Sequence, residues 1–170
     1  ELLAAHKKRA GLTFSLPQVL AKIIDSENLL TVANRIKCEE KFRGALAAGL
    51  RPVLDAVDIN GAKSTFELIS QFEDSENAVI RLSSEVEFHE IKIKMPDIEE
   101  NCWRASDLVL NQCNLGSFIK NRLCNLVIVS DASVMQKLIS FAVNANLRIA
   151  TLNGDLFEPD GVIYAGDIDS

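Results

Sequence analysis

Near its C-terminal end the sequence reads Leu147-Arg-Ile-Ala-Thr-Leu-Asn-Gly-Asp-Leu-Phe-Glu-Pro-Asp-Gly-Val-Ile-Tyr-Ala-Gly166. In this stretch, short apolar segments are separated by two polar turns, Asn-Gly-Asp and Pro-Asp-Gly. Glycine favours such turns because it lacks a Cβ atom and reaches positive φ angles at little cost. The pattern predicts three short strands joined by tight turns. The last of them, Val162–Tyr164, carries no charge, and we expect it to be an unprotected edge of a sheet.

The sequence contains an internal repeat, whose two halves show the same order of segments. The offset is 72 residues where Ala33 matches Ala105, and it stays between 70 and 73 residues at the other matches. Each half has an apolar segment, a helix, an apolar strand that ends in aspartate, and a second helix. Because two copies are too few for a solenoid, the repeat predicts two α/β lobes related by an approximate twofold axis. We expect Val53–Val57 and Leu126–Val129 to be corresponding strands, and Asp131 to cap the helix that follows.

The pattern divides the chain into three segments. Residues 1–25 stand outside the repeat and predict a helical segment, residues 26–95 form the first lobe, and residues 96–170 form the second. Two strand-like segments, 78–82 and 91–95, could each close the first lobe. The sequence leaves that choice open.

Composition limits the class of protein. The chain of 170 residues is 48% hydrophobic and 25% charged, which is typical of a globular protein long enough to bury a core. Its formal net charge of −6 argues against a dedicated nucleic-acid clamp, although a local basic face is compatible with it. No window approaches 18 uninterrupted apolar residues, so the sequence predicts no membrane span.

The residue types that usually carry chemistry do not form a recognisable site. Cys38, Cys102, Cys113 and Cys124 include no Cys-x-x-Cys pair, which favours reduced thiols over a metal site. The segment Asn60–Ser64 lacks the first glycine and the length of a phosphate-binding loop.

The acidic cluster at residues 97–100 is explained by the positive end of a helix, and the two histidines lie in unrelated segments. The sequence therefore predicts no catalytic residue, no metal, no cofactor and no bound nucleotide, so that the chain is not an enzyme.

The C-terminal stretch resembles the terminal element of the hinge domain of structural maintenance of chromosomes (SMC) proteins, in which a run of the type Thr-Leu-Asp-Gly-Asp-Leu…Pro-x-Gly-x-Ile-x-x-Gly is characteristic. Three further segments resemble the family in order and spacing, and the resemblance extends from Ser26 to Gly166. These segments are Ala45–Leu50 followed by Val53–Asp58, Ala105–Val109, and Asn121–Asp131.

The resemblance implies a mixed α/β fold of two hinge-type lobes, with a helical coiled-coil junction at residues 1–25. It implies the function of a dimerisation hinge, which joins two coiled-coil arms of a condensin- or cohesin-like protein and pairs with the same or another SMC-type hinge. In such proteins the ATPase heads lie elsewhere in the full-length chain. The implied location is intracellular and chromosome-associated, and nuclear in a eukaryote.

Family hinges place dimer contacts at paired glycines, where two backbones approach closely. This chain keeps only the second glycine of each pair, at Ala48-Gly49, Asp160-Gly161 and Ala165-Gly166, so it resembles a divergent member. Glutamate at positions 49 and 166 should dissociate the dimer and leave each lobe folded. The implied interface residues are Ala48, Gly49, Gly161, Val162, Ile163, Tyr164, Ala165 and Gly166.

Two other functions are compatible with the residues. A hinge-like module could serve mainly to bind DNA, weakly and through phosphates, and a small-molecule-binding α/β domain is the second alternative. Trp103 is expected to anchor lobe packing rather than to stack on a base. The candidate DNA-binding residues are Lys7, Lys8, Arg9, Lys120 and Arg122.

Overall fold

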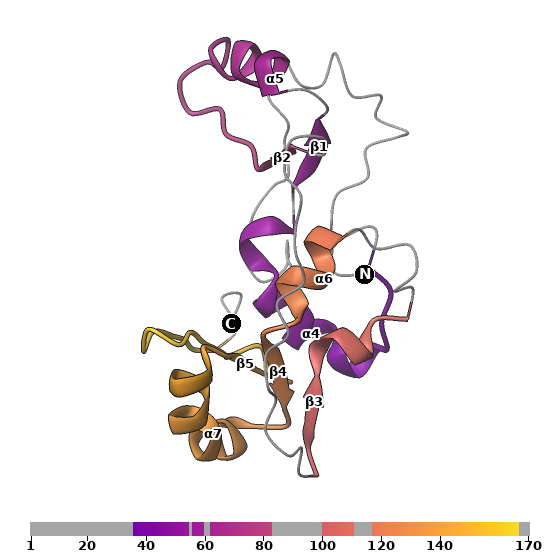
Figure 1. Cartoon of the computed structure of the whole chain (residues 1–170), viewed down its shortest axis with the longest axis vertical. Coiled ribbons are helices and arrows are strands. Elements are labelled where there is room, and N and C mark those ends of the chain that lie inside the picture. Colours follow the sequence, from indigo (N-terminus) through magenta and orange to yellow (C-terminus); the bar gives the residue numbers. More distant parts are fainter. Residues whose placement is uncertain (1–35, 55, 60–61, 83–99, 111–116, 167–170) are drawn as a thin grey trace.

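A computed structural model describes residues 36–54, 56–59, 62–82, 100–110 and 117–166 of the chain. The described strands form two separate sheets. The larger has the order β3 (Cys102–Arg104), β4 (Leu126–Val129), β5 (Arg148–Thr151), β6 (Leu156–Phe157) and β7 (Ile163–Tyr164). The smaller pairs β1 (Val57–Ile59) with β2 (Ile80–Leu82). Figure 1 shows the smaller sheet and its helix at one end of an elongated molecule and the larger sheet at the other.

The second half of the chain forms a strand–helix–strand unit, in which β4 and β5 are parallel neighbours. All four residues of β4 are buried, as predicted for a strand covered on both faces. The crossover that parallel strands require is α7 (Ala132–Ala145). The Asp131 carboxylate accepts a hydrogen bond from the Val134 amide at 3.1 Å, so the predicted cap is confirmed. Asn146 ends the helix in the left-handed conformation, with φ 55°.

The first half repeats this unit, with α5 (Ala62–Ile69) connecting the parallel strands β1 and β2. The repeat in the sequence therefore corresponds to a repeat of parallel strand pairs. Of the two segments that could close the first lobe, 78–82 contains β2, and 91–95 lies outside the described residues.

The predicted strand Val53–Val57 is wrong. The chain there forms the short 3-10 helix η2 (Arg51–Val53), and β1 begins only at Val57. A proline at the start of η2 favours this conformation, because proline restricts φ to values that a helix also requires. The Val53 amide instead donates to the Leu50 carbonyl at 2.9 Å.

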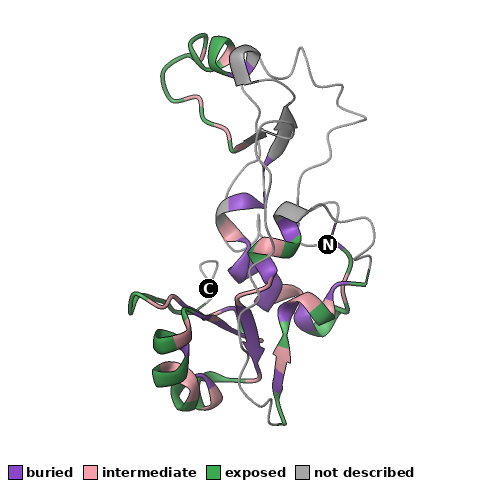
Figure 2. Cartoon of the chain, viewed as in Figure 1, coloured by how far each residue is buried: buried purple, intermediate pink, exposed green. Residues whose placement is uncertain are grey.

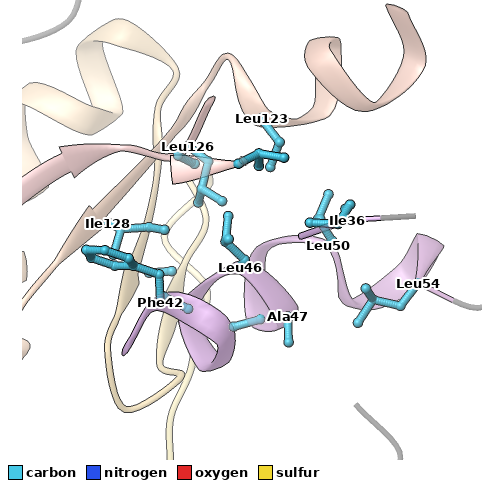
Figure 3. Packing of buried hydrophobic residues seen from close by; sticks show 14 of the residues in the cluster. Ile36, Phe42, Leu46, Ala47, Leu50, Leu54, Leu123, Leu126 and Ile128 are labelled. Atoms are coloured by element: carbon cyan, nitrogen blue, oxygen red, sulfur yellow. The ribbon is translucent and has the colours of Figure 1, made fainter. Parts of the chain in front are cut away.

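A cluster of buried apolar side chains covers each face of the larger sheet. On one face, α4 (Glu40–Gly49) packs against β4, β5 and β6, and Figure 3 shows Phe42 and Leu46 of this helix beside Ile128 and Leu126 of β4. The same cluster includes residues of η3 (Ala105–Leu108) and α6 (Ser117–Leu123). On the other face, α7 covers the sheet with one side and leaves its outer side exposed (Figure 2).

The helix α4 thus belongs to the first half of the sequence but packs on the sheet of the second half. Trp103 on β3 contributes to this packing, since its ring meets that of Phe42 edge-on with centroids 5.1 Å apart. Trp103 therefore has the packing role that was expected of it. Residues from before and after position 95 therefore pack in one cluster. The division of the chain into lobes at 95/96 stays a prediction.

Candidate functional site: an exposed sheet edge

The strand β7 forms one edge of the larger sheet, and β6 is its partner among the described strands. Leu156 and Phe157 of β6 are only 3% and 2% exposed, whereas Ile163 and Tyr164 of β7 are 50% and 49% exposed. Val162, just before the strand, is also exposed. The uncharged edge strand predicted from the sequence is confirmed in its position and its exposure.

A tight turn holds β7 next to β6. The Glu158 amide donates to the Val162 carbonyl at 2.8 Å, and the Gly161 amide donates back to the Glu158 carbonyl at 2.9 Å. The Asp160 carboxylate accepts from the Val162 amide at 3.2 Å. Gly161 adopts φ 97°, which is the conformation that glycine reaches most easily. The Pro-Asp-Gly turn predicted from the sequence is therefore present.

The Asp155 carboxylate holds the far end of β7. Its Oδ1 accepts from the Gly166 amide at 2.5 Å, and its Oδ2 accepts from the hydroxyl of Thr151 at 2.9 Å. The Asp155 amide in turn donates to the Thr151 hydroxyl at 3.0 Å. The side chain of Thr151 is fully buried, so one end of this network is fixed in the sheet. Asp155 thereby ties the end of β7 to β5.

Arg148 holds the turn itself. Its Nε donates to both carboxylate oxygens of Glu158 at 3.2 Å, and its Nη2 donates to the carbonyl oxygen of Gly49 at 2.6 Å. The two side chains are 12% and 27% exposed, so water screens this ion pair only in part. Sequence reasoning missed both Arg148 and Asp155. The sequence signals were the charge of Arg148 inside an otherwise apolar strand, and the position of Asp155 in the turn that follows Thr151.

The predicted interface residues fall into two groups. Residues 161–166 are all exposed and lie on or beside β7. Ala48 and Gly49 are buried by their own chain, and a Cβ atom added to Gly49 would meet the side chain of Leu126. Glutamate at position 49 would bring a carboxylate into a packed core, so we expect this substitution to destabilise the fold as well as any interface. A role of these two residues in a dimer contact stays a prediction.

Of the five predicted basic residues, the structure describes Lys120 and Arg122. Lys120 and Arg122 are exposed in the last turn of α6, where the negative end of the helix dipole favours positive charge. Lys7, Lys8 and Arg9 lie outside the described residues.

The described part of the chain also shows no other kind of site. It holds no group of three or more histidine, cysteine, aspartate or glutamate residues that could bind a metal ion. Cys38, Cys102 and Cys124 form no disulfide bond among the described residues. No helix in the described ranges is both long enough and apolar enough to cross a bilayer.

Comparison with known proteins finds no matching family model and no matching curated protein, but it finds solved structures of the same architecture. The hinge domain of the Pyrococcus furiosus SMC protein is 20% identical, with a TM-score of 0.63 over 99% of this chain and 88% of that one. An asymmetric dimer of the Geobacillus stearothermophilus SMC hinge domain gives 12% identity, a TM-score of 0.65, and coverage of 97% and 71%.

The structure described as the folded elbow of cohesin gives 14% identity and a TM-score of 0.67. The match covers 97% of this chain but only 23% of the cohesin chain. At these identities the likenesses establish a common fold, which matches the fold class predicted from the sequence.

Proposed function

We propose that this chain, whose fold is that of an SMC hinge domain, is the dimerisation hinge of an SMC-type chromosome-organising protein. The observation that carries the proposal is the exposed, uncharged edge strand β7, which is held in place at both ends. The partner is another hinge of the same kind, which pairs with this edge.

An unpaired sheet edge leaves backbone hydrogen-bonding groups without protein partners. A sheet edge presents backbone donors and acceptors to solvent, and monomeric proteins commonly protect it with charge, proline or a covering element. β7 carries neither charge nor proline, and both of its side chains are half exposed. A partner strand would satisfy the backbone groups and remove apolar area from water.

The structural neighbours support the kind of partner. The Geobacillus hinge is described as a dimer, so a domain of this fold pairs with a second hinge in that protein. By the same likeness we propose that residues 1–25 lead into a coiled-coil arm, that the ATPase heads lie elsewhere in the full-length protein, and that the protein acts on chromosomes, in the nucleus in a eukaryote.

DNA binding is not favoured as the main role. The described members of the basic set, Lys120 and Arg122, sit where a helix end accounts for them. We propose that any DNA contact is weak, depends on phosphates and is lost steeply with salt.

Sedimentation velocity tests the proposal. The chain is measured alone, and then in separate mixtures with every further SMC hinge of its source organism. One of these samples should sediment as a dimer. The double variant Ile163→Glu/Tyr164→Glu should shift that sample to monomer. The matched control Val143→Glu/Asn144→Glu adds the same charge to exposed positions of α7 and should leave the dimer intact. A wild-type chain that is monomeric in every sample contradicts the proposal.

A further inference from the structure

The outer side of α5 exposes two large apolar side chains. Phe66 is 64% exposed and Ile69 is 42% exposed, and residues three positions apart in a helix are neighbours on its surface. Thr65 is only 2% exposed, so a small polar residue is buried while the adjacent phenylalanine faces solvent. Such inversions of ordinary burial are informative, because exposed apolar patches mark interaction sites. The described residues leave this side of α5 uncovered.

Acidic residues accompany this apolar side. Residues 65–79 contain four acidic residues and no lysine, arginine or histidine. Glu67 lies on α5 itself, Glu73 and Asp74 follow in the next loop, and all three are exposed. None of these three carboxylates forms an ion pair with another described residue. The segment thus combines exposed apolar area with unpaired negative charge.

Hydrogen bonds fix the acidic loop next to the end of α5. The Phe72 amide donates to the Ile69 carbonyl at 3.1 Å. The Glu76 carboxylate accepts from the Glu73 amide at 2.8 Å, and the Glu76 amide donates to the Glu73 carbonyl at 3.1 Å. Figure 2 shows this end of α5 and the loop after it as mostly exposed. The last turn of α5 contains no basic residue, although the end of a helix favours positive charge, so both the helix end and the loop attract a cation.

We propose that this surface, named the α5 surface, binds a basic amphipathic segment of another protein. Apolar side chains of that segment pack on the exposed pair, and its lysine or arginine side chains pair with the carboxylates. The proposal goes beyond dimerisation, because α5 belongs to the smaller sheet, at the other end of the molecule from the larger sheet and its edge β7 (Figure 1). The α5 surface consists of Phe66, Glu67, Ile69, Glu73 and Asp74.

Charge disfavours other occupants of the α5 surface. DNA and anionic lipid carry phosphate groups, which the carboxylates repel. A second copy of the same surface would bring like charges together. An uncharged apolar helix would cover the apolar pair but would desolvate the carboxylates without supplying cations. A segment that is both apolar and basic meets both requirements.

Fluorescence anisotropy with model peptides tests the proposal on the whole chain. The probe is a fluorescein-labelled amphipathic peptide of leucine and lysine, about 18 residues long, which is five helical turns. One control peptide replaces leucine with serine and keeps the charge, and another replaces lysine with glutamate and keeps the apolar face. Both controls should bind at least about tenfold more weakly than the probe, because each lacks one of the two required interactions.

Substitutions on the α5 surface test its two components separately. Phe66→Ser/Ile69→Ser removes the exposed apolar pair and should weaken binding of the probe about tenfold or more. Glu67→Gln/Glu73→Gln/Asp74→Asn removes the charge at nearly constant shape and should also weaken binding about tenfold or more. Added salt should weaken binding to the wild-type chain and have little effect on what remains in the charge variant.

Two matched controls lie on other elements. Phe141→Ser/Val143→Ser removes exposed apolar side chains from α7, which contains no acidic residue, and binding should stay within about twofold of wild type. Ile163→Glu/Tyr164→Glu changes β7 and should also leave binding of the probe within about twofold. Failure of this proposal and failure of dimerisation are therefore separate results.

Amide chemical shifts of the wild-type chain locate the bound probe without any substitution. Shift changes centred on residues 65–76, together with loss of binding in both sets of α5 variants, support the proposal. It is overturned if the probe does not bind, if the serine–lysine peptide binds equally well, or if the shift changes centre on another surface. Circular dichroism checks that each variant is folded, and the shift map decides the question for any variant that is not.

Discussion

The Nη2 atom of Arg148 lies 2.6 Å from the carbonyl oxygen of Gly49, a residue 99 positions earlier in the chain. Gly49 is the last residue of α4, where unpaired carbonyl groups favour a positive charge. The same guanidinium binds the carboxylate of Glu158 at the turn before β7. Arg148 thus joins the end of a helix from the first half of the sequence to the edge hairpin of the second.

Replacement of Arg148 should destabilise the protein. Arg148→Met leaves the partly buried carboxylate of Glu158 without its cation and removes the donor to Gly49. Loss of one partner from such a pair costs about 2–4 kcal/mol in the free energy of unfolding. Urea denaturation should show this loss as a lower transition midpoint.

Arg148→Lys is the matched control for charge. Lysine keeps the positive charge but cannot present parallel donors to Glu158 and a third to Gly49, so its effect should be intermediate. Equal stability of the lysine variant and wild type would show that charge alone explains the contact.

Gly49 and Leu126 should be coupled through packing. In Gly49→Ala, the new methyl group meets the buried Leu126 side chain. Overpacking costs about 1–3 kcal/mol, more than the roughly 1 kcal/mol that alanine gains over glycine in a helix. Gly49→Ala should therefore destabilise the wild-type chain in thermal or urea unfolding.

The sign should reverse when Leu126 is shortened. In a Leu126→Ala background the space is free, and Gly49→Ala should become neutral or stabilising by up to about 1 kcal/mol. A double-mutant cycle measures this difference. Additive effects of the two changes would contradict the contact.

Much of the fold could be predicted from local patterns. The apolar run at Leu126–Val129, the cap at Asp131 and the turn at Gly161 are set by neighbours within a few residues, and the structure confirms them. The strand predicted at Val53–Val57 was wrong, because the effect of Pro52 on the backbone outweighed the apolar pattern.

The site was predictable only in part. The exposure of Val162–Tyr164 follows from an uncharged strand that the sequence places last in its sheet. The burial of Gly49 could not be predicted, because it depends on Leu126, which comes 77 positions later. The contact of Arg148 with Gly49 has the same origin, since it exists only after α4 packs across the two halves.

Cys38 should react slowly with alkylating reagents. Burial disfavours the thiolate and raises the pKa of Cys38, although the positive charge of Arg43 acts in the opposite direction. At pH 8 less of this thiol is ionised than in free cysteine, so iodoacetamide should modify it more slowly, as followed by peptide mass spectrometry. Cys38 in the urea-unfolded chain is the control and should react faster.

The same shift sets the sign of a pH effect on stability. Because the pKa is raised in the folded state, the contribution of Cys38 to stability is complete below the unfolded pKa of about 8.5 and declines as the pH rises through the folded value. Relative to Cys38→Ser, the wild-type chain should therefore lose stability above about pH 8.5. A difference that does not change with pH would contradict this assignment.

Asp155 should keep β7 ordered before a partner binds. The strand is two residues long, so its order depends on the contacts at its ends. Asp155→Ala removes the acceptor of the Gly166 amide and of the Thr151 hydroxyl. In diluted, monomeric protein, the Gly166 amide should exchange with solvent about tenfold faster or more. Association should weaken several-fold, because binding must then also order the strand.

Thr151→Val separates this role from general stability. Valine removes the hydroxyl but leaves the Asp155 carboxylate free to accept from Gly166, so the variant should lose about 1 kcal/mol of stability while Gly166 stays protected. If Asp155→Ala also leaves Gly166 protected, the carboxylate does not hold the strand. If exchange accelerates but association is unchanged, β7 is ordered by Asp155 for a reason other than partner binding. Faster exchange together with weaker association would connect the acidic residue of the Asn-Gly-Asp turn directly to the pairing edge.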